Sequence, residues 1–182
     1  MLNYGCLFEK ERFIIMKIEK VNASDVDEIF AIYSSARRFM RETGNPSQWA
    51  DNYPSPSVIC TDIKEQRLYK ITEDEKIYGV FCFFIGEEPT YREIYEGECG
   101  SAAPCGVIHR VAISDLARGR GVSYKIFDYC SSISPYLRID THRDNIPMQK
   151  ALEKFGFTRR GIIYLANGDE RIAFDYCRRK DN

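Results

Sequence analysis

The chain has 182 residues, which is enough for one domain with a substantial core and too few for a second full domain. Its 26 basic and 27 acidic residues give a net charge of −1, which excludes the broad positive field that holds a protein on nucleic acid or on an anionic membrane. Seven cysteines, an odd number without C-x-x-C spacing, predict neither a disulfide framework nor a metal site and indicate reduced thiols in the cytoplasm.

The amino terminus is predicted to be an extension of the domain. Its apolar run, residues 13–16, follows four charged residues and precedes no small-residue cleavage site, so it does not fit a signal peptide. No stretch reaches the length of a membrane span, and we expect no membrane-bound segment. Met16 opens a segment typical of the first strand of a domain, so residues 1–15 are expected to be an extension or an upstream start.

A strand and two helices are predicted next. Residues 14–21 have the pattern of a strand. Ser24 and Asp27 suit a helix start before the periodic apolar side chains, and Gly44 ends that helix. Ser55, followed by a proline, predicts the cap and the first turn of a second helix.

A hairpin and a long loop follow the helices. Residues 67–72 and 77–85 are predicted strands joined by the charged turn 73–76, and the second strand is apolar throughout, which favours a central place in the sheet. The connection 86–103 is long enough to favour a functional loop, although a solvated surface excursion remains open. Its acidic and tyrosine side chains are Glu87, Glu88, Tyr91, Glu93, Tyr95, Glu96 and Glu98.

The second half of the chain alternates strands and helices. Residues 106–113 and 136–140 are predicted strands, and apolar side chains at helical spacing predict a helix over 122–133 between them. A second helix is predicted over 147–155, with Gly156 as its left-handed terminator.

The chain is predicted to end in a β-hairpin. Residues 161–166 and 171–176 form its strands, and Asn167-Gly168 is the strongest two-residue signal for a hairpin turn. No internal repeat or low-complexity linker interrupts this order.

A glycine-rich basic loop precedes the helix predicted over 122–133. A helix amino terminus presents unpaired N–H groups and a partial positive charge to an anion. Gly119 and Gly121 allow the backbone to turn and approach a ligand, Arg118 and Arg120 add charge, and Ser123 adds a small hydroxyl. The loop matches neither nucleotide-binding motif. By itself it is equally well read as an ordinary basic turn that caps a helix.

This loop resembles the cofactor motif of the GNAT superfamily of N-acetyltransferases. That motif reads Arg or Gln, two residues, Gly, one residue, then Gly or Ala, and Arg118, Gly121 and Ser123 occupy its places, with serine as a small departure. The pyrophosphate of coenzyme A rests on this loop in the family. The resemblance therefore implies contacts to the cofactor from Arg118, Gly119, Arg120, Gly121, Val122 and Ser123.

The resemblance continues on both sides of the loop. The strand 107–113 is similar to the family's fourth strand, whose splayed end bonds the pantetheine arm through its backbone, which implies that role for Val111 and Ile113. The residues Gly156-Phe157 resemble the end of the family's second motif, and Asn145 its start, which implies that Asn145 touches the cofactor arm.

The resemblance covers residues 16–177, with its specific motifs between 107 and 157, and leaves a tail at 178–182. It implies an α/β (α+β) fold with a single domain, in which a central mixed, mostly antiparallel sheet of about six or seven strands carries helices on both faces and is splayed at the cofactor strand. It also implies acetyl-CoA as co-substrate and direct transfer to a primary amine, without a covalent enzyme intermediate.

His109 is the candidate general base. Strand side chains alternate, so His109 is expected on the same face as Val107, Val111 and Ile113, and its ordinary titration range suits proton transfer. A hydrogen-bonded histidine of the core is the alternative reading. His142 is the other histidine, and the sequence favours it no more strongly.

The general acid is left open by the sequence. Leu152 stands where the family often has a tyrosine, and Tyr124, Tyr164 or water could replace it. A cysteine nucleophile, Cys99 or Cys105, is disfavoured because nothing in the sequence indicates a lowered thiol pKa or an oriented base.

Two further functions are alternatives to N-acetyltransfer. A non-catalytic acyl-CoA-binding module is suggested by Leu152 and by the uncertain base. A nucleic-acid binder is disfavoured by net charge and by the lack of stacking aromatic residues among the basic ones. The acidic loop is expected to attract a cationic acceptor, and small amines, peptide amino termini and lysine side chains all remain open, as does a homodimer.

Overall fold

The structure is a computed structural model, and it describes residues 16–50, 52–100 and 104–178. The predicted extension, residues 1–15, lies outside the described residues, as does most of the predicted tail. Within the described ranges no helix is long and apolar enough to cross a membrane.

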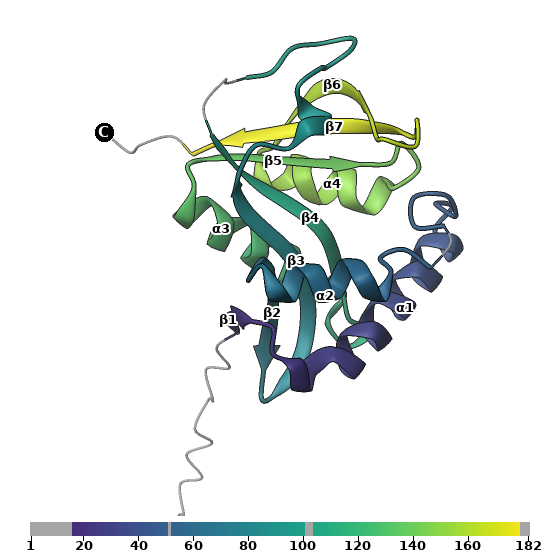
Figure 1. Cartoon of the computed structure of the whole chain (residues 1–182), viewed down its shortest axis with the longest axis vertical. Helices are drawn as coiled ribbons and strands as arrows, with labels where there is room; N and C mark the ends of the chain where they lie inside the picture. Colours follow the sequence, from purple (N-terminus) through teal and green to yellow (C-terminus); the bar gives the residue numbers. More distant parts are fainter. Residues whose placement is uncertain (1–15, 51, 101–103, 179–182) are drawn as a thin grey trace, which may run out of the picture.

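A seven-stranded sheet forms the centre of the fold, in the order β1-β2-β3-β4-β5-β7-β6 (Figure 1). Among the described strands β4 and β5 are the one parallel pair, and the other neighbours are antiparallel. The predicted mixed, mostly antiparallel sheet is thus confirmed. The strands are β1 (Lys17–Lys20), β2 (Leu68–Glu73), β3 (Lys76–Gly86), β4 (Cys105–Ile113), β5 (Tyr136–Thr141), β6 (Thr158–Tyr164) and β7 (Glu170–Cys177).

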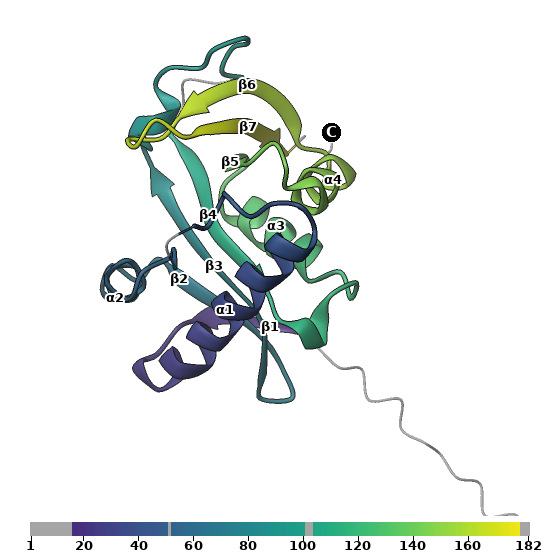
Figure 2. The same cartoon turned by 90° about the vertical axis from the view of Figure 1, so that its right-hand side faces the viewer.

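Helices cover both faces of the sheet, as predicted (Figures 1 and 2). On one face α1 (Val26–Glu42) and α2 (Pro56–Lys64) bury apolar side chains against β2 and β3. On the other face α3 (Val122–Ile133) and α4 (Ile146–Phe155) build the larger core with β3, β4 and β5. Burial of these two faces provides the main driving force for the fold.

Helix ends follow the predicted caps, with one exception. Ser55 Oγ accepts the N–H of Val58 and starts α2. The expected start at Ser24 and Asp27 is wrong, because a 3₁₀ turn (Ala23–Asp25) precedes α1 and the Asn22 N–H donates to the Asp25 carboxylate over 2.7 Å. Asp25 is held there by a second, longer-range contact, since it also pairs with a buried lysine of β2.

The carboxyl-terminal hairpin is longer than predicted. Its strands run over Thr158–Tyr164 and Glu170–Cys177, and Gly168 in the predicted turn has a φ of 86°. Tyr95 of the long loop forms a bridge with Ile162 of β6, so this part of the loop is attached to the sheet edge. The loop is therefore more than a solvated excursion.

The parallel strands β4 and β5 separate soon after they meet. Their ladder pairs are Gly106 with Leu137 and Val107 with Arg138. A Cβ on Gly106 would come within 2.8 Å of the Leu137 side chain, so glycine allows the close approach at this point. Beyond Val107 the two strands diverge, which confirms the predicted splay and opens the sheet beside β4.

Candidate functional site

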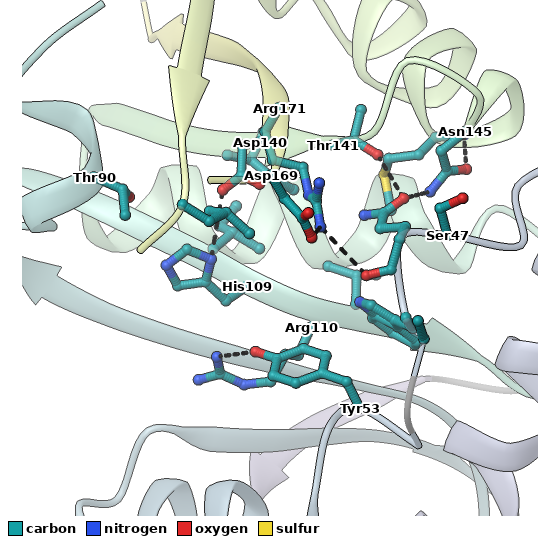
Figure 3. Close-up of a pocket in the computed structure, with 18 of the residues that line it drawn as sticks. Ser47, Tyr53, Thr90, His109, Arg110, Asp140, Thr141, Asn145, Asp169 and Arg171 are labelled. Carbon is teal, nitrogen blue, oxygen red and sulfur yellow. Dashed lines mark hydrogen bonds and ion pairs between the residues drawn. The ribbon is translucent and has the colours of Figure 1, made fainter. Parts of the chain in front are cut away.

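A cleft of about 1050 Å³ opens where β4 and β5 diverge. Its other walls are residues 46–50 with Tyr53 and Ser55, between α1 and α2, and the turn between β6 and β7 (Figure 3). Side chains from distant parts of the chain, among them Trp49, His109, Asp140 and Arg171, line it together. A concave site of this size with convergent polar groups is the usual form of a small-molecule site.

A β-bulge in β4 changes the predicted orientation of His109. Arg110 and Val111 both lie opposite Phe81, so β4 carries one extra residue at this point. Arg110 has a φ of 53°, in the left-handed region. The expectation that His109 shares a face with Val111 and Ile113 is therefore wrong, since the extra residue reverses the alternation of side chains between them.

Buried polar contacts hold this bulge. Arg110 makes a bidentate ion pair with Asp62 of α2, at 2.7 and 2.8 Å, and both side chains are at least 85% buried. Arg110 Nη1 donates to the Tyr53 hydroxyl over 3.1 Å, and the Arg110 carbonyl accepts from Tyr33 over 3.1 Å. The Cys82 thiol donates to Asp62, and burial raises its pKa to about 12. Helix α2 thus fixes the backbone next to His109.

His109 lies between two carboxylates at the wall of the cleft, and Figure 3 shows one of them, Asp140. Its Nε2 is 3.0 Å from Glu88 Oε2, and its Nδ1 is 3.8 Å from Asp140 Oδ1. The Tyr91 hydroxyl donates to Asp140 over 2.7 Å, and the Tyr91 ring stacks on the imidazole. The three polar side chains come from the long loop, β4 and β5, and each is at least 80% buried.

The surroundings of His109 shift two neighbouring pKa values. The hydrogen bond from His109 lowers the pKa of Glu88, against the opposing effect of burial. Burial and the adjacent Asp140 carboxylate raise the pKa of Tyr91 well above its usual range. Glu88 is therefore an anion at neutral pH, and Tyr91 remains a neutral hydrogen-bond donor.

The predicted phosphate loop has the geometry of an anion site. Gly119 and Gly121 have φ values of 77° and 75°, and a Cβ on either would meet nothing within 4 Å. No described side chain caps the amino terminus of α3, so its first-turn N–H groups have no side-chain acceptor. An anion such as a pyrophosphate fits this arrangement.

The two arginines of that loop contact groups of the protein itself. Arg118 pairs with Asp115 over 2.8 Å and lies over the Phe39 ring, with its guanidinium centre 3.9 Å from the ring centroid. Arg120 pairs over 2.7 Å with Glu73, which is buried. The backbone of the loop, rather than the guanidinium groups, faces the open anion site in this structure.

The other predicted cofactor residues differ in their positions. Val111 and Asn145 line the cleft, whereas Ile113 packs against the larger core. Asn145 caps α4, accepting the Met148 N–H over 3.2 Å, and donates from its amide to Gln48 over 2.8 Å. Residues 118–123 lie outside the cleft lining, so cofactor loop and cleft are separate parts of one predicted site.

The residues considered for the acid and nucleophile roles lie away from the cleft. Leu152 is fully buried in the core. Tyr124 and Tyr164 are about half exposed and pack on other rings, and the tyrosine that lines the cleft is Tyr53. Burial raises the pKa of Cys105, which opposes formation of a nucleophilic thiolate.

Sequence reasoning missed most of the side chains that surround His109. Glu88 belonged to the acidic loop already noted, but nothing distinguished it from its neighbours, of which Glu87 pairs with exposed Arg92. Asp140 and Arg171 gave no signal because they reach the cleft only through the pairing of β5 with β7. His142, the alternative base, instead accepts the Asp144 N–H and lies outside the lining.

No family model and no curated protein matches the chain. Solved structures do match it. An acetyltransferase of the GNAT family from Streptococcus agalactiae 2603 is 29% identical, with a TM-score of 0.84 over 91% of this chain and 96% of that chain. A GNAT-family acetyltransferase from Bacillus cereus ATCC 10987 is 25% identical, with a TM-score of 0.58 over 91% of this chain and 99% of that chain. Another, from Listeria monocytogenes 4b F2365, is 16% identical, with a TM-score of 0.67 over 89% of this chain and 94% of that chain. The chain therefore has the fold of GNAT-family acetyltransferases, and its similarity to the Streptococcus agalactiae and Bacillus cereus proteins supports the GNAT superfamily.

Proposed function

We propose that this protein is an N-acetyltransferase that transfers the acetyl group of acetyl-CoA to a primary amine by direct attack on the thioester. Similarity to GNAT-family acetyltransferases supports acetyl transfer in general. The observation that carries the more specific proposal is the position of His109 between Glu88 and Asp140 at the wall of the cleft. Two carboxylates attract a protonated amine, and an imidazole accepts its proton.

The protonation state of Glu88 determines which imidazole nitrogen acts as the base. An ionised carboxylate only accepts hydrogen bonds, so Nε2 of His109 carries the hydrogen that Glu88 accepts. In the neutral ring Nδ1 is then the acceptor. The gap of 3.8 Å between Nδ1 and Asp140 lets one amine nitrogen lie within hydrogen-bond distance of both. His109 therefore takes the amine proton at Nδ1.

Acetyl-CoA supplies the activated acetyl group when bound, and the chain has features that fit it. The open amino terminus of α3, with Gly119 and Gly121, suits the pyrophosphate. The edge of β4 beyond Val107 lacks a partner in β5 and can bond an extended arm through its backbone. The acceptor nitrogen forms a bond to the carbonyl carbon, the C–S bond breaks, and coenzyme A leaves with its sulfur as thiolate or thiol.

The proposal is tested by incubating the purified protein with acetyl-CoA and a panel of primary amines. Free coenzyme A is measured by chromatography, because the exposed Cys60, Cys99 and Cys177 would consume a thiol reagent. The acetylated amine is identified by mass spectrometry. Amine-dependent release of coenzyme A with formation of the acetylated amine is the expected result.

The alternative, a non-catalytic acyl-CoA-binding module, makes a different prediction in the same assay. Such a module would bind acetyl-CoA without amine-dependent release of coenzyme A over the whole panel. The buried carboxylates beside His109 favour the enzyme, because a module that only holds a cofactor has no need for charged groups on the acceptor side.

A further inference from the structure

A buried arginine forms part of the cleft on the acceptor side. Arg171 of β7 is 4% exposed and lines the cleft. Ala173, two positions further along β7, pairs with Asp140 of β5, so Arg171 and Asp140 project from the same face of the sheet. Diagonal neighbours of this kind have Cα atoms about 7–8 Å apart. Figure 3 shows Arg171 next to Asp140, above His109.

The positive charge of Arg171 is only weakly compensated by the protein. A guanidinium has five N–H donors. Among the described residues, the partners of Arg171 are the Glu170 carbonyl at 2.8 Å, the Gln48 carbonyl at 3.4 Å and the Asp169 carboxylate at 3.5 Å. Asp169 is 49% exposed, and one of its oxygens also accepts from the side chain of Asn167. Two carbonyls and one half-exposed carboxylate at 3.5 Å compensate a buried guanidinium less than a close, buried carboxylate does.

Two other arginines of the cleft provide a comparison. Arg110 is neutralised by its bidentate pair with the buried Asp62. Arg67 is 42% exposed, pairs with Glu65 over 2.9 Å and is screened by solvent. Arg171 is therefore the lining arginine that is both buried and without a close carboxylate partner.

We infer that the acceptor is a small primary amine that also carries a carboxylate, an amino acid, whose carboxylate binds Arg171 while its amine lies between His109 and Asp140. This inference rests on the proposed function. It explains why anionic and cationic side chains from neighbouring strands face the same cleft, as a zwitterion requires. A guanidinium is also the side chain best suited to bind a carboxylate.

The first test needs no variant. Transfer rates are measured for a set of α-amino acids and straight-chain ω-amino acids, each beside its decarboxylated amine and its methyl ester. We expect the best amino acid to exceed both counterparts by about tenfold or more in kcat/KM, since a charge-assisted hydrogen bond contributes at least that factor. Equal rates for acids, esters and decarboxylated amines would overturn the inference and leave the proposed function intact.

The second test uses Arg171→Gln, with Arg171→Lys as a variant that keeps the charge if the first does not fold. We expect the preference for the acid over the ester to be lost in R171Q and partly retained in R171K. The loss should come from a higher KM for the amino acid, with kcat little changed. Arg143→Gln is the control, because Arg143 is 63% exposed, pairs with Glu170 and lies outside the cleft lining. An unchanged preference in folded R171Q contradicts a role for Arg171.

A binding measurement separates this inference from the proposed function. Trp49 is the single tryptophan of the chain and lines the cleft, so its fluorescence reports on the site. If no amine is acetylated, the proposed function fails. Saturable quenching of Trp49 by amino acids that is lost in R171Q would then still support the carboxylate site, and absence of quenching in the wild type would overturn it.

Discussion

His109 and Val111 lie two positions apart on β4 and nevertheless project toward opposite faces of the sheet, because Arg110 between them has a φ of 53°. Both line the cleft, which reaches the two faces through the gap between β4 and β5. A single inserted residue thus places the proposed base on the acceptor side and Val111 on the side of α3.

The bulge is expected to depend on Asp62. Replacing Asp62 with Asn leaves the buried Arg110 guanidinium without its counter-charge, and loss of one partner of a buried ion pair costs about 3–5 kcal/mol of unfolding free energy. We expect a lower melting temperature and a lower kcat at temperatures where the variant is folded. Glu65→Gln is the matched control, since Glu65 ends α2 in an exposed pair. A loss of activity no larger than the unfolded fraction would show that the pair serves stability alone.

Replacing His109 with Gln is expected to slow transfer and leave acetyl-CoA affinity unchanged. Glutamine can still hydrogen-bond Glu88 but cannot accept a proton, and a general base contributes about a hundredfold to ten-thousandfold in rate. Steady-state kinetics and calorimetric titration with acetyl-CoA separate the two effects. Wild-type turnover across the pH range would show that His109 has a structural role only.

Glu88 predicts a pH dependence of stability. Its pKa is lowered in the folded protein by the hydrogen bond from His109, so its contribution to stability is present above the ordinary carboxyl pKa. This contribution is lost as the pH falls through the lowered value. Glu88→Gln should therefore be less stable than wild type near neutral pH, with the difference shrinking in acid. Melting temperatures measured between neutral and acidic pH test this, and a constant difference would count against it.

Gly121 predicts a specific effect on cofactor affinity. Gly121 and Gly156 both have positive φ values, so alanine strains either position by about 1–2 kcal/mol. Gly156 ends α4 and lies outside the proposed cofactor loop. We expect both variants to lose similar stability, and Gly121→Ala alone to weaken acetyl-CoA binding. Equal affinities in the two variants would refute the assignment of the loop.

Much of the fold was predictable because it depends on local signals. The helix at 122–133 has the predicted bounds, since its apolar periodicity and the preceding glycine are contained in one segment. Ser55 capped α2 and Gly156 ended α4 for the same reason. The start of α1 was missed because Asp25 is selected partly by a lysine 45 residues away, a contact that no local pattern encodes.

The acceptor side was not predictable because its geometry is tertiary. The left-handed conformation of Arg110 is unusual for a residue other than glycine and is imposed by Asp62 from another element. Alternation along the strand therefore placed His109 correctly relative to Val107 but wrongly relative to Val111 and Ile113, which lie beyond the bulge. Asp140 and Arg171 become neighbours only through the register of β5 and β7, which the sequence alone does not specify.

The short β4–β5 ladder has a mechanical consequence. In the described sheet only two residue pairs join β4 to β5, so the sheet consists of two parts, β1–β4 and β5–β7. The core packed against α3 and α4 contains side chains from both parts and holds them together. His109 belongs to the first part, and Asp140 and Arg171 to the second. A molecule that bonds to both parts would connect them, and at concentrations above its Kd it would raise the free energy of unfolding of the whole domain.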